Sequence, residues 1–196
     1  MTYQGVCTVN EQLNIDIIRK QLRRHTVTLL DREDLTRAAV LIPLVNTGDG
    51  LDLLFTVRTD EVEHHKGQIS FPGGAMEPGD KSVEDTAIRE SREELSIIPE
   101  DVDIFGRLDD VWTPTGFVVA PITGYLAQLP DLRPEPREVS DFFLAPLSFF
   151  LDDSNVRTEV YQYEGEPRKV WFYEYGEYTI WGITASIIRL FLNILR

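Results

Sequence analysis

Cysteine, histidine and positive charge are all scarce in this 196-residue chain. The single cysteine, Cys7, excludes an internal disulfide and any zinc cluster built on cysteines. The three histidines, at positions 25, 64 and 65, are too few and wrongly spaced for a histidine zinc site. Only 19 lysines and arginines stand against 33 aspartates and glutamates, so the net charge is −14. An acidic surface repels phosphate backbones and anionic lipids, which argues against nucleic-acid and membrane partners.

Long apolar runs are also missing. The most apolar stretch, near the C-terminus, is interrupted by Arg189 and Asn193 and is shorter than the roughly 20 residues that a membrane helix needs. The N-terminus lacks a basic stretch followed by an apolar core, so no secretory signal is expected and a cytoplasmic protein is predicted. The length predicts a single domain over residues 1–196.

Hydrophobic periodicity and turn residues predict a mixture of helices and strands. Pro43 is expected to place its strand at a sheet edge or a bulge, and the proline-rich stretch 130–137 is expected to be an exposed loop. The apolar C-terminal helix is expected to pack on the sheet, with a dimer contact as the alternative. The predicted helices are about 10–24, 82–95 and about 184–195, and the predicted strands are 37–45, 51–58, 68–71, 103–109, 117–126, 141–147, 158–163 and 169–175. This mixture favours an α+β fold or an α/β/α sandwich.

Three glutamates cluster on the predicted helix at 82–95. Glu90 is followed by Glu93 and Glu94 at three and four residues, positions whose Cβ atoms lie about 5–6 Å apart on one helix face. Like charges at this spacing disfavour a helix, so a cation is expected to gather them. Carboxylate oxygens suit Mg²⁺ or Mn²⁺. Arg89 is placed to brace the cluster from the side. A solvated charged face is the alternative interpretation.

The segment around these glutamates resembles the Nudix box, written G-x5-E-x7-R-E-U-x-E-E-x-G-U. Residues 74–97 carry it: Gly74 is its first glycine, Asp80 stands at its first acidic place, and its R-E and E-E pairs are residues 89–90 and 93–94. Three departures are visible. Eight residues rather than seven separate the acidic place from the arginine, Ser91 occupies the apolar place, and Ser96 replaces the last glycine.

The extra residue, together with three further segments, is similar to the coenzyme A pyrophosphatase branch of this family. Residues 54–58 read Leu-Phe-Thr-Val-Arg, and residues 66–74 read Lys-Gly-Gln-Ile-Ser-Phe-Pro-Gly-Gly. Residues 180–185 read Ile-Trp-Gly-Ile-Thr-Ala and match a W-G-x-T-A pattern. The resemblance spans most of the chain, from about 38 to 185.

The resemblance implies a Nudix-type α/β/α sandwich with a mixed sheet and a hydrolase that needs Mg²⁺ or Mn²⁺. It implies that water attacks a phosphorus atom of a pyrophosphate, and for coenzyme A the products are 3′,5′-ADP and 4′-phosphopantetheine. The residues carried over are Glu90 and Glu94 as principal metal ligands, Glu93 as a further ligand directly or through water, and the Gly74 carbonyl as a backbone ligand. The general base is expected to be a glutamate of the box, Glu93, or a later acid, Glu138; Arg58, Lys66 and Gln68 are candidates for holding the outer phosphates.

Two other functions stay open at this point. One is a Nudix hydrolase of a different small nucleotide, such as ADP-ribose or a dNTP. The other is a non-catalytic Nudix-like module that binds a nucleotide. The clustered acids weigh against the second, because a binding module has no need of so many carboxylates. The sequence leaves the oligomeric state open between a monomer and a homodimer.

Overall fold

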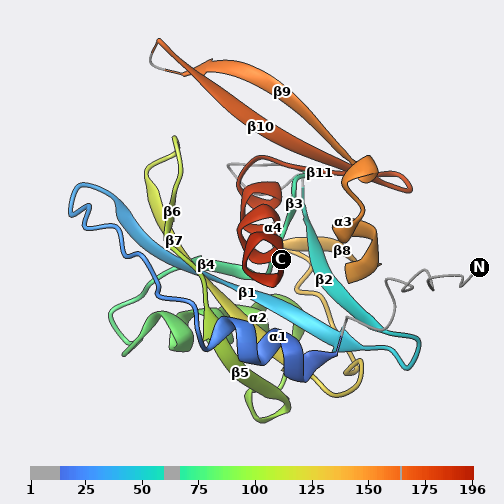
Figure 1. Ribbon diagram of the computed structural model, residues 1–196. Helices are drawn as coiled ribbons and strands as arrows, with labels where there is room; N and C mark the ends of the chain where they lie inside the picture. Colours follow the sequence, from blue (N-terminus) through green and yellow to red (C-terminus); the bar gives the residue numbers. More distant parts are fainter. Residues whose placement is uncertain (1–13, 60–66, 164) are drawn as a thin grey trace, which may run out of the picture.

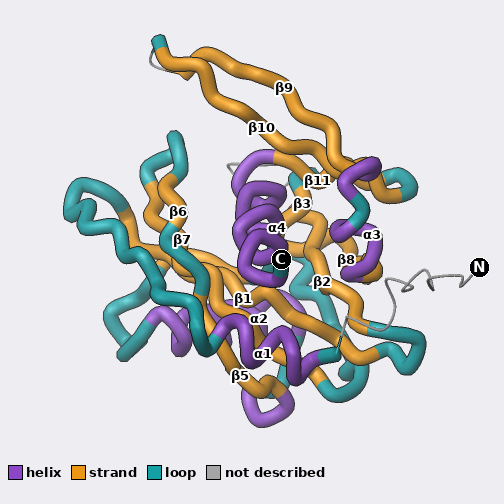
Figure 2. Tube along the Cα trace, viewed as in Figure 1, coloured by secondary structure: helices purple, strands orange, loops and turns teal. Residues whose placement is uncertain are grey.

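A mixed sheet of eight strands lies between helices in the computed structural model, which describes residues 14–59, 67–163 and 165–196 (Figure 1). The strand order is β3-β2-β1-β7-β5, and β4, β6 and β8 pair with β1, β7 and β2 respectively. The strands are β1 (Thr36–Asn46), β2 (Leu51–Arg58), β3 (Ile69–Ser70), β4 (Gly73–Ala75), β5 (Val102–Arg107), β6 (Val111–Trp112), β7 (Phe117–Leu126) and β8 (Val139–Pro146). One helix, α2 (Val83–Leu95), covers one face, and α1 (Ile15–Leu22) and α4 (Gly182–Leu195) cover the other (Figure 2). This confirms the predicted α/β/α sandwich.

The central strand β1 is buried on both faces because its sequence is apolar at nearly every position. Ala38 and Ile42 belong to the hydrophobic cluster shared with α1 and α4, whereas Ala39 and Leu41 belong to the cluster shared with α2. β1 runs parallel to β7 and antiparallel to β2 and β4. A parallel pair is stable when helices cover both of its faces, which is the arrangement found here.

Pro43 does not lie on an edge strand, and the edge prediction was wrong. It pairs with Gly124 of β7 inside the sheet. On the other side of β1, residues 38–40 pair with β4 and residues 44–46 pair with β2. Pro43 falls between these two pairings, where the partner of β1 changes, so the sheet tolerates its missing N–H.

Helices α2 and α4 lie where the sequence predicts helices, at 82–95 and about 184–195. Ser82 caps α2 by accepting a hydrogen bond from the N–H of Asp85 at 3.1 Å, which satisfies a backbone donor that lacks a partner within the helix. The Asp85 carboxylate accepts from the N–H of Lys81 at 3.1 Å. The apolar side chains of α4, including Ile188 and Phe191, are buried in the main core, so α4 packs on the sheet. Residues 10–13 of the predicted N-terminal helix lie outside the described residues.

The structure adds elements that the sequence patterns do not predict. A short helix, α3 (Leu147–Leu151), occupies the end of the strand expected at 141–147 and is followed by a 3₁₀ turn, η3 (Asp153–Asn155). The strands predicted at 158–163 and 169–175 are present as β9 (Val156–Tyr163) and β10 (Glu166–Tyr175), which form a hairpin, and β11 (Tyr178–Trp181) extends it to a three-stranded sheet. Another 3₁₀ turn, η2 (Pro99–Asp101), precedes β5. No helix among the described residues is long and apolar enough to cross a membrane.

Candidate metal centre

Two consecutive glycines bring β4 against both the central sheet and helix α2. A Cβ on Gly73 would lie 2.4 Å from the carbonyl oxygen of Ala39, and a Cβ on Gly74 would lie 2.4 Å from Oε1 of Glu90. Neither position accepts a side chain without moving its neighbours. The glycine pair therefore lets the β4 backbone approach the acidic face of α2.

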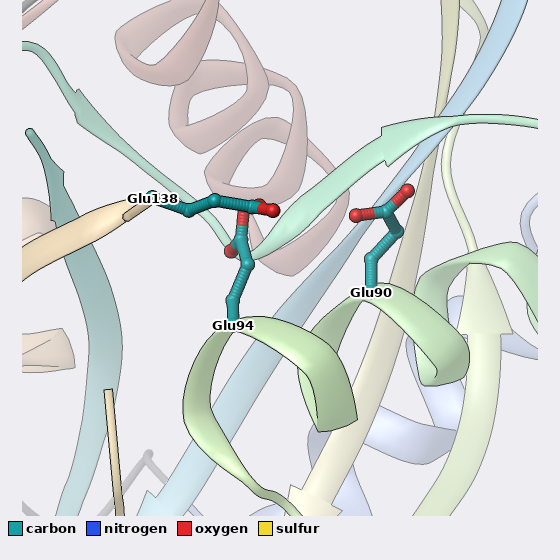
Figure 3. Close-up of side chains that lie close together, drawn as sticks. All are labelled: Glu90, Glu94 and Glu138. Atoms are coloured by element: carbon teal, nitrogen blue, oxygen red, sulfur yellow. The ribbon is translucent and has the colours of Figure 1, made fainter. Parts of the chain in front are cut away.

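Three carboxylates converge beside β4. Glu90 and Glu94 project from the same side of α2, and Glu138 reaches across from the segment before β8, so that its carboxylate lies beside that of Glu94 (Figure 3). One oxygen from each of the three lies within 4.8 Å of the others. Among the residues that the structure describes, this is the group of acids that meets the geometry of a metal site.

Glu94 is the most buried of the three, with 2% of its surface exposed. The pKa of its carboxyl group is raised to about 8, chiefly by burial and also by the nearby carboxylates of Glu90 and Glu138, while Arg58 and the N–H of Gly73 oppose the rise. Its Oε2 atom has no hydrogen-bond partner among the described residues. A buried oxygen without a partner is costly, so Glu94 has an unmet need for a positively charged or hydrogen-donating group.

Arg89 organises the acids around the cluster. Its guanidinium donates to both carboxylate oxygens of Asp80, at 3.0 and 2.9 Å, and to the carbonyl oxygen of Ala75 at 3.0 Å. It also donates to Glu90 at 2.9 Å and to Glu93 at 3.0 Å. These bonds confirm the predicted bracing role. The hydrogen bonds from Arg89 hold the pKa of Asp80 well below its usual range, so this ion pair stays charged.

Two opposing influences act on the pKa of Glu90. Burial raises the pKa of its carboxyl group, whereas the hydrogen bond and positive charge of Arg89 lower it, and the net direction is upward. Arg89 leaves one Glu90 oxygen for other partners because it donates to Oε1. Arg89 therefore fixes the position of Glu90 without taking up the whole carboxylate.

Glu138 is held in place by the loop that precedes it. The N–H groups of Arg133 and Glu135 donate to the carbonyls of Leu95 and Glu94 at the end of α2, at 3.0 and 2.9 Å. The Glu138 carbonyl accepts from the N–H of Thr59 at 3.0 Å. The proline-rich stretch is exposed as predicted, but its backbone is tied to α2 and β2. Helix carbonyls that lack partners at a C-terminus are satisfied in this way.

The other predicted site residues do not belong to the three-carboxylate group. The Glu93 side chain is 56% exposed, pairs with Arg89, and lies outside the three-carboxylate group. The Arg58 guanidinium comes within 3.9 Å of Glu94, and its Nε is buried without a hydrogen-bond partner among the described residues. The backbone carbonyl of Gln68 accepts from the N–H of Arg58 at 3.0 Å. Lys66 lies outside the described residues.

Two contributions were not predicted from the sequence. The N–H of Gly73 forms a hydrogen bond that lowers the pKa of Glu94. In the sequence, only the doubled glycine hints at this contact. The Thr184 hydroxyl donates to the carbonyl of Ile69 at 3.0 Å, which ties the start of α4 to β3. This bond joins the segments at 66–74 and 180–185, and no local pattern reveals that they touch.

The donor set fits a hard divalent cation. All three side chains offer carboxylate oxygens, the ligand type that Mg²⁺ and Mn²⁺ prefer. Oε2 of Glu94 lacks a hydrogen-bond partner among the described residues, and the Glu90 carboxylate occupies the position that a Cβ of Gly74 would take. Within the described part of the chain, Glu90, Glu94 and Glu138 are therefore the group that fits such an ion.

Comparison with known proteins identifies similar sequences and folds. The family model of the NUDIX domain matches residues 35–163. An uncharacterized Nudix hydrolase, NudL, of Enterobacter sp. (strain 638) is 42% identical over 164 residues, which cover 82% of this chain and 84% of that protein. The protein of the same description from Escherichia coli (strain SMS-3-5 / SECEC) is 35% identical over 192 residues, or 96% and 95% of the two chains.

Solved structures share the fold at low sequence identity. A MutT/nudix family protein from Enterococcus faecalis aligns with a TM-score of 0.54 at 14% identity, covering 98% of this chain and 76% of that one. A protein from Deinococcus radiodurans aligns with a TM-score of 0.53 at 15% identity, covering 86% and 93%. At this identity the likeness concerns the fold alone.

Proposed function

The chain belongs to the Nudix family of hydrolases, and from that premise we propose that it hydrolyses the pyrophosphate bond of coenzyme A or acyl-coenzyme A with Mg²⁺ or Mn²⁺. The products would be 3′,5′-ADP and 4′-phosphopantetheine or its acyl derivative. The observation that carries the hydrolytic part is the convergence of Glu90, Glu94 and Glu138 within 4.8 Å.

The coenzyme A part rests on the signature segments at 54–58, 66–74 and 180–185. Two contacts make these segments neighbours: Thr184 bonds to the carbonyl of Ile69, and Arg58 bonds through its N–H to the carbonyl of Gln68. All three segments thus border the acidic cluster or its supporting strands. This proximity supports a shared role in binding one substrate.

We assign roles to the acids by their burial and neighbours. Glu90 and Glu94 would be direct metal ligands, with the Gly74 carbonyl as a backbone ligand. Glu93 would act through water, because its carboxylate already pairs with Arg89. A bound divalent ion would neutralise charge on the phosphate oxygens and lower the pKa of a coordinated water.

Glu138 would accept the proton of the attacking water. Its carboxylate belongs to the cluster but is exposed at the surface, so it can pass the proton on to solvent. As the new phosphorus–oxygen bond forms, the bridging bond of the pyrophosphate breaks. The leaving phosphate oxygen carries away the electron pair. Arg58, beside Glu94, would face the substrate phosphates, and we propose the same for Lys66 and Gln68.

A substrate panel tests this proposal. Purified protein is incubated with coenzyme A, acetyl-coenzyme A, ADP-ribose and dNTPs, each with Mg²⁺, with Mn²⁺ or with a chelator, and the products are identified by mass spectrometry. Metal-dependent formation of 3′,5′-ADP from coenzyme A supports the proposal. Preferential cleavage of ADP-ribose or a dNTP would reject the substrate, and nucleotide binding without any cleavage would reject the hydrolytic activity.

A further inference from the structure

Strand β9 is an open edge on an arm of the molecule. In the view of Figure 1 the β9–β10 hairpin lies above the central sheet with β9 on its outer side, and its tip reaches β6, where the ring of Trp112 lies 5.9 Å from that of Tyr163. Among the described residues, β10 is the strand that pairs with β9, and the three-stranded sheet ends there. The pairing runs from Val156 opposite Tyr173 to Tyr163 opposite Glu166 without a register shift. Alternate backbone groups of β9 therefore point away from β10.

This edge has few of the features that protect edge strands. Proteins commonly guard such strands with proline, lysine, bulges or short length. β9 has eight residues, no proline and no lysine, and one base and one acid, Arg157 and Glu159. Val160 is 67% exposed and Tyr161 is 49% exposed. A long, regular edge with neutral net charge and exposed apolar side chains favours pairing with another strand.

We propose that two copies of the chain associate through β9, antiparallel to each other, about a twofold axis at Thr158. The two hairpins would join their three-stranded sheets into one. In this register Arg157 of each copy lies opposite Glu159 of the other, and Val156 lies opposite Val160. Opposite residues in an antiparallel pair share a face, so both sets of side chains meet.

The charge pattern selects this register. An axis at Glu159 would set two acids against each other, and an axis at Arg157 would set two bases against each other; both arrangements are destabilising. Arg157 is already held on the outer face of the hairpin, where it pairs with Glu159 and, at 3.3 Å, with Glu174. A strand that complements β9 must carry an acid two residues after a base, and β9 itself carries that sequence. This self-complementarity argues for a second copy as the partner.

The oligomeric state tests the proposal. Sedimentation and light scattering of the full chain are measured over a wide concentration range near 0.15 M salt, which screens the repulsion between two copies of charge −14. The mass should rise from 22.5 kDa towards twice that value. Arg157→Glu and Glu159→Arg, which each set like charges opposite each other, should remain monomeric at the same concentrations.

Mixing the two variants shows whether each is monomeric because strand pairing is lost or because the fold is damaged. The Arg157→Glu chain and the Glu159→Arg chain complement each other in the proposed register, so an equimolar mixture should form a heterodimer. The double swap Arg157→Glu/Glu159→Arg should restore the homodimer. Both variants lie far from the acidic cluster in sequence, and metal-dependent hydrolysis serves as the check that each is folded. A wild-type chain that stays monomeric, a dimer that survives Arg157→Glu, or a mixture that stays monomeric would each overturn the proposal.

Discussion

The carboxyl group of Glu94 is almost fully buried but only partly paired with other groups. Its carboxylate is 2% exposed, and one oxygen has no partner among the described residues. Arg58 at 3.9 Å is the nearby cation, too distant for a close hydrogen bond. Burying a charge without full pairing costs free energy, and a bound divalent cation would offset that cost. A residue with this environment is typical of a functional site.

The first prediction concerns the Glu94→Gln variant. Loss of a direct metal ligand should lower kcat/KM by more than the 10–100-fold expected for a residue that only supports a ligand, so by at least roughly 100-fold. The neutral amide replaces a carboxyl group whose pKa is already raised to about 8, so thermal stability without metal should not fall. Hydrolysis rates and the shift in Tm on adding Mn²⁺ measure both effects.

Glu84→Gln, the same change on the same helix, is the matched control and should keep both the activity and the metal-induced rise in Tm. Near-normal turnover of Glu94→Gln on every nucleotide of the panel would reject the metal assignment.

The second prediction concerns Glu138, which combines membership of the cluster with an exposed position. Glu138→Gln should lower kcat by about 10²–10⁴-fold, the usual contribution of a general base, while the affinity for Mn²⁺ changes much less. Steady-state kinetics and calorimetric titration with Mn²⁺ give the two quantities. Glu135→Gln in the same loop is the control. An unchanged kcat in Glu138→Gln would remove this residue from the mechanism.

At the scale of elements, helix α2 depends on how its ends are closed. Ser82 caps the first turn, and Ser96 closes the last turn in a left-handed conformation with φ 58° and ψ 28°. The family pattern has glycine at the Ser96 position because only glycine adopts this conformation freely. Ser96 instead adds a hydrogen bond from its hydroxyl to the carbonyl of Arg133 at 3.2 Å. The helix end, its cap and the loop carrying Glu138 thus form one connected unit.

The third prediction tests this helix end. Ser96→Val places a β-branched residue at positive φ and should lower the free energy of unfolding by about 1–3 kcal/mol. Ser96→Gly relieves the strained conformation but loses the bond to Arg133, so it should stay within about 1 kcal/mol of the wild type. Urea unfolding of the three proteins gives the comparison. Equal stability of Ser96→Val and the wild type would show that the conformation carries no strain.

At the scale of the whole molecule, the acidic residues occur in different environments and make different contacts. Nine acids and three bases fall between residues 73 and 101, around the candidate metal centre. Elsewhere, the fully buried side chain of Asp110 joins distant segments: it accepts from Arg37 of β1, from Arg107 of β5 and from the N–H of Leu30. Acids therefore form the candidate metal centre in one place and tie the N-terminal segment to the sheet in another.

The fourth prediction concerns pH. Burial would raise the pKa of Asp110, but its hydrogen bonds with Arg37, Leu30 and Arg107 outweigh burial and leave the pKa below the ordinary value. A lowered pKa means that the unfolded chain binds the proton more readily, so this stabilisation is present above the unfolded pKa of about 3.9 and is lost as pH falls through the folded pKa.

Asp110→Asn should accordingly lower the free energy of unfolding by about 1–3 kcal/mol at pH 7, and the difference from the wild type should shrink below about pH 4. Denaturant titrations across the pH range give the difference directly. A constant difference down to low pH would mean that the contribution of Asp110 does not depend on its charge.

Features that depend on short-range spacing were predictable from the sequence. The helix at 83–95 and the shared face of Glu90 and Glu94 follow from a periodicity of 3.6 residues and from a capping serine. The buried strand at 36–46 follows from its continuous apolar run. The box pattern likewise placed Asp80 and Arg89 in one motif, and the structure makes them a bidentate ion pair.

Only the tertiary structure decided the features that depend on contacts between distant segments. It brought Glu138 beside Glu94, joined Thr184 to Ile69, and let Pro43 sit inside the sheet where the partner of β1 changes. It also separated Glu93 from the carboxylates next to it in sequence. The physical reason is that helix and strand patterns arise from neighbours along the chain, whereas strand order, loop docking and side-chain burial arise from packing among elements far apart in the sequence.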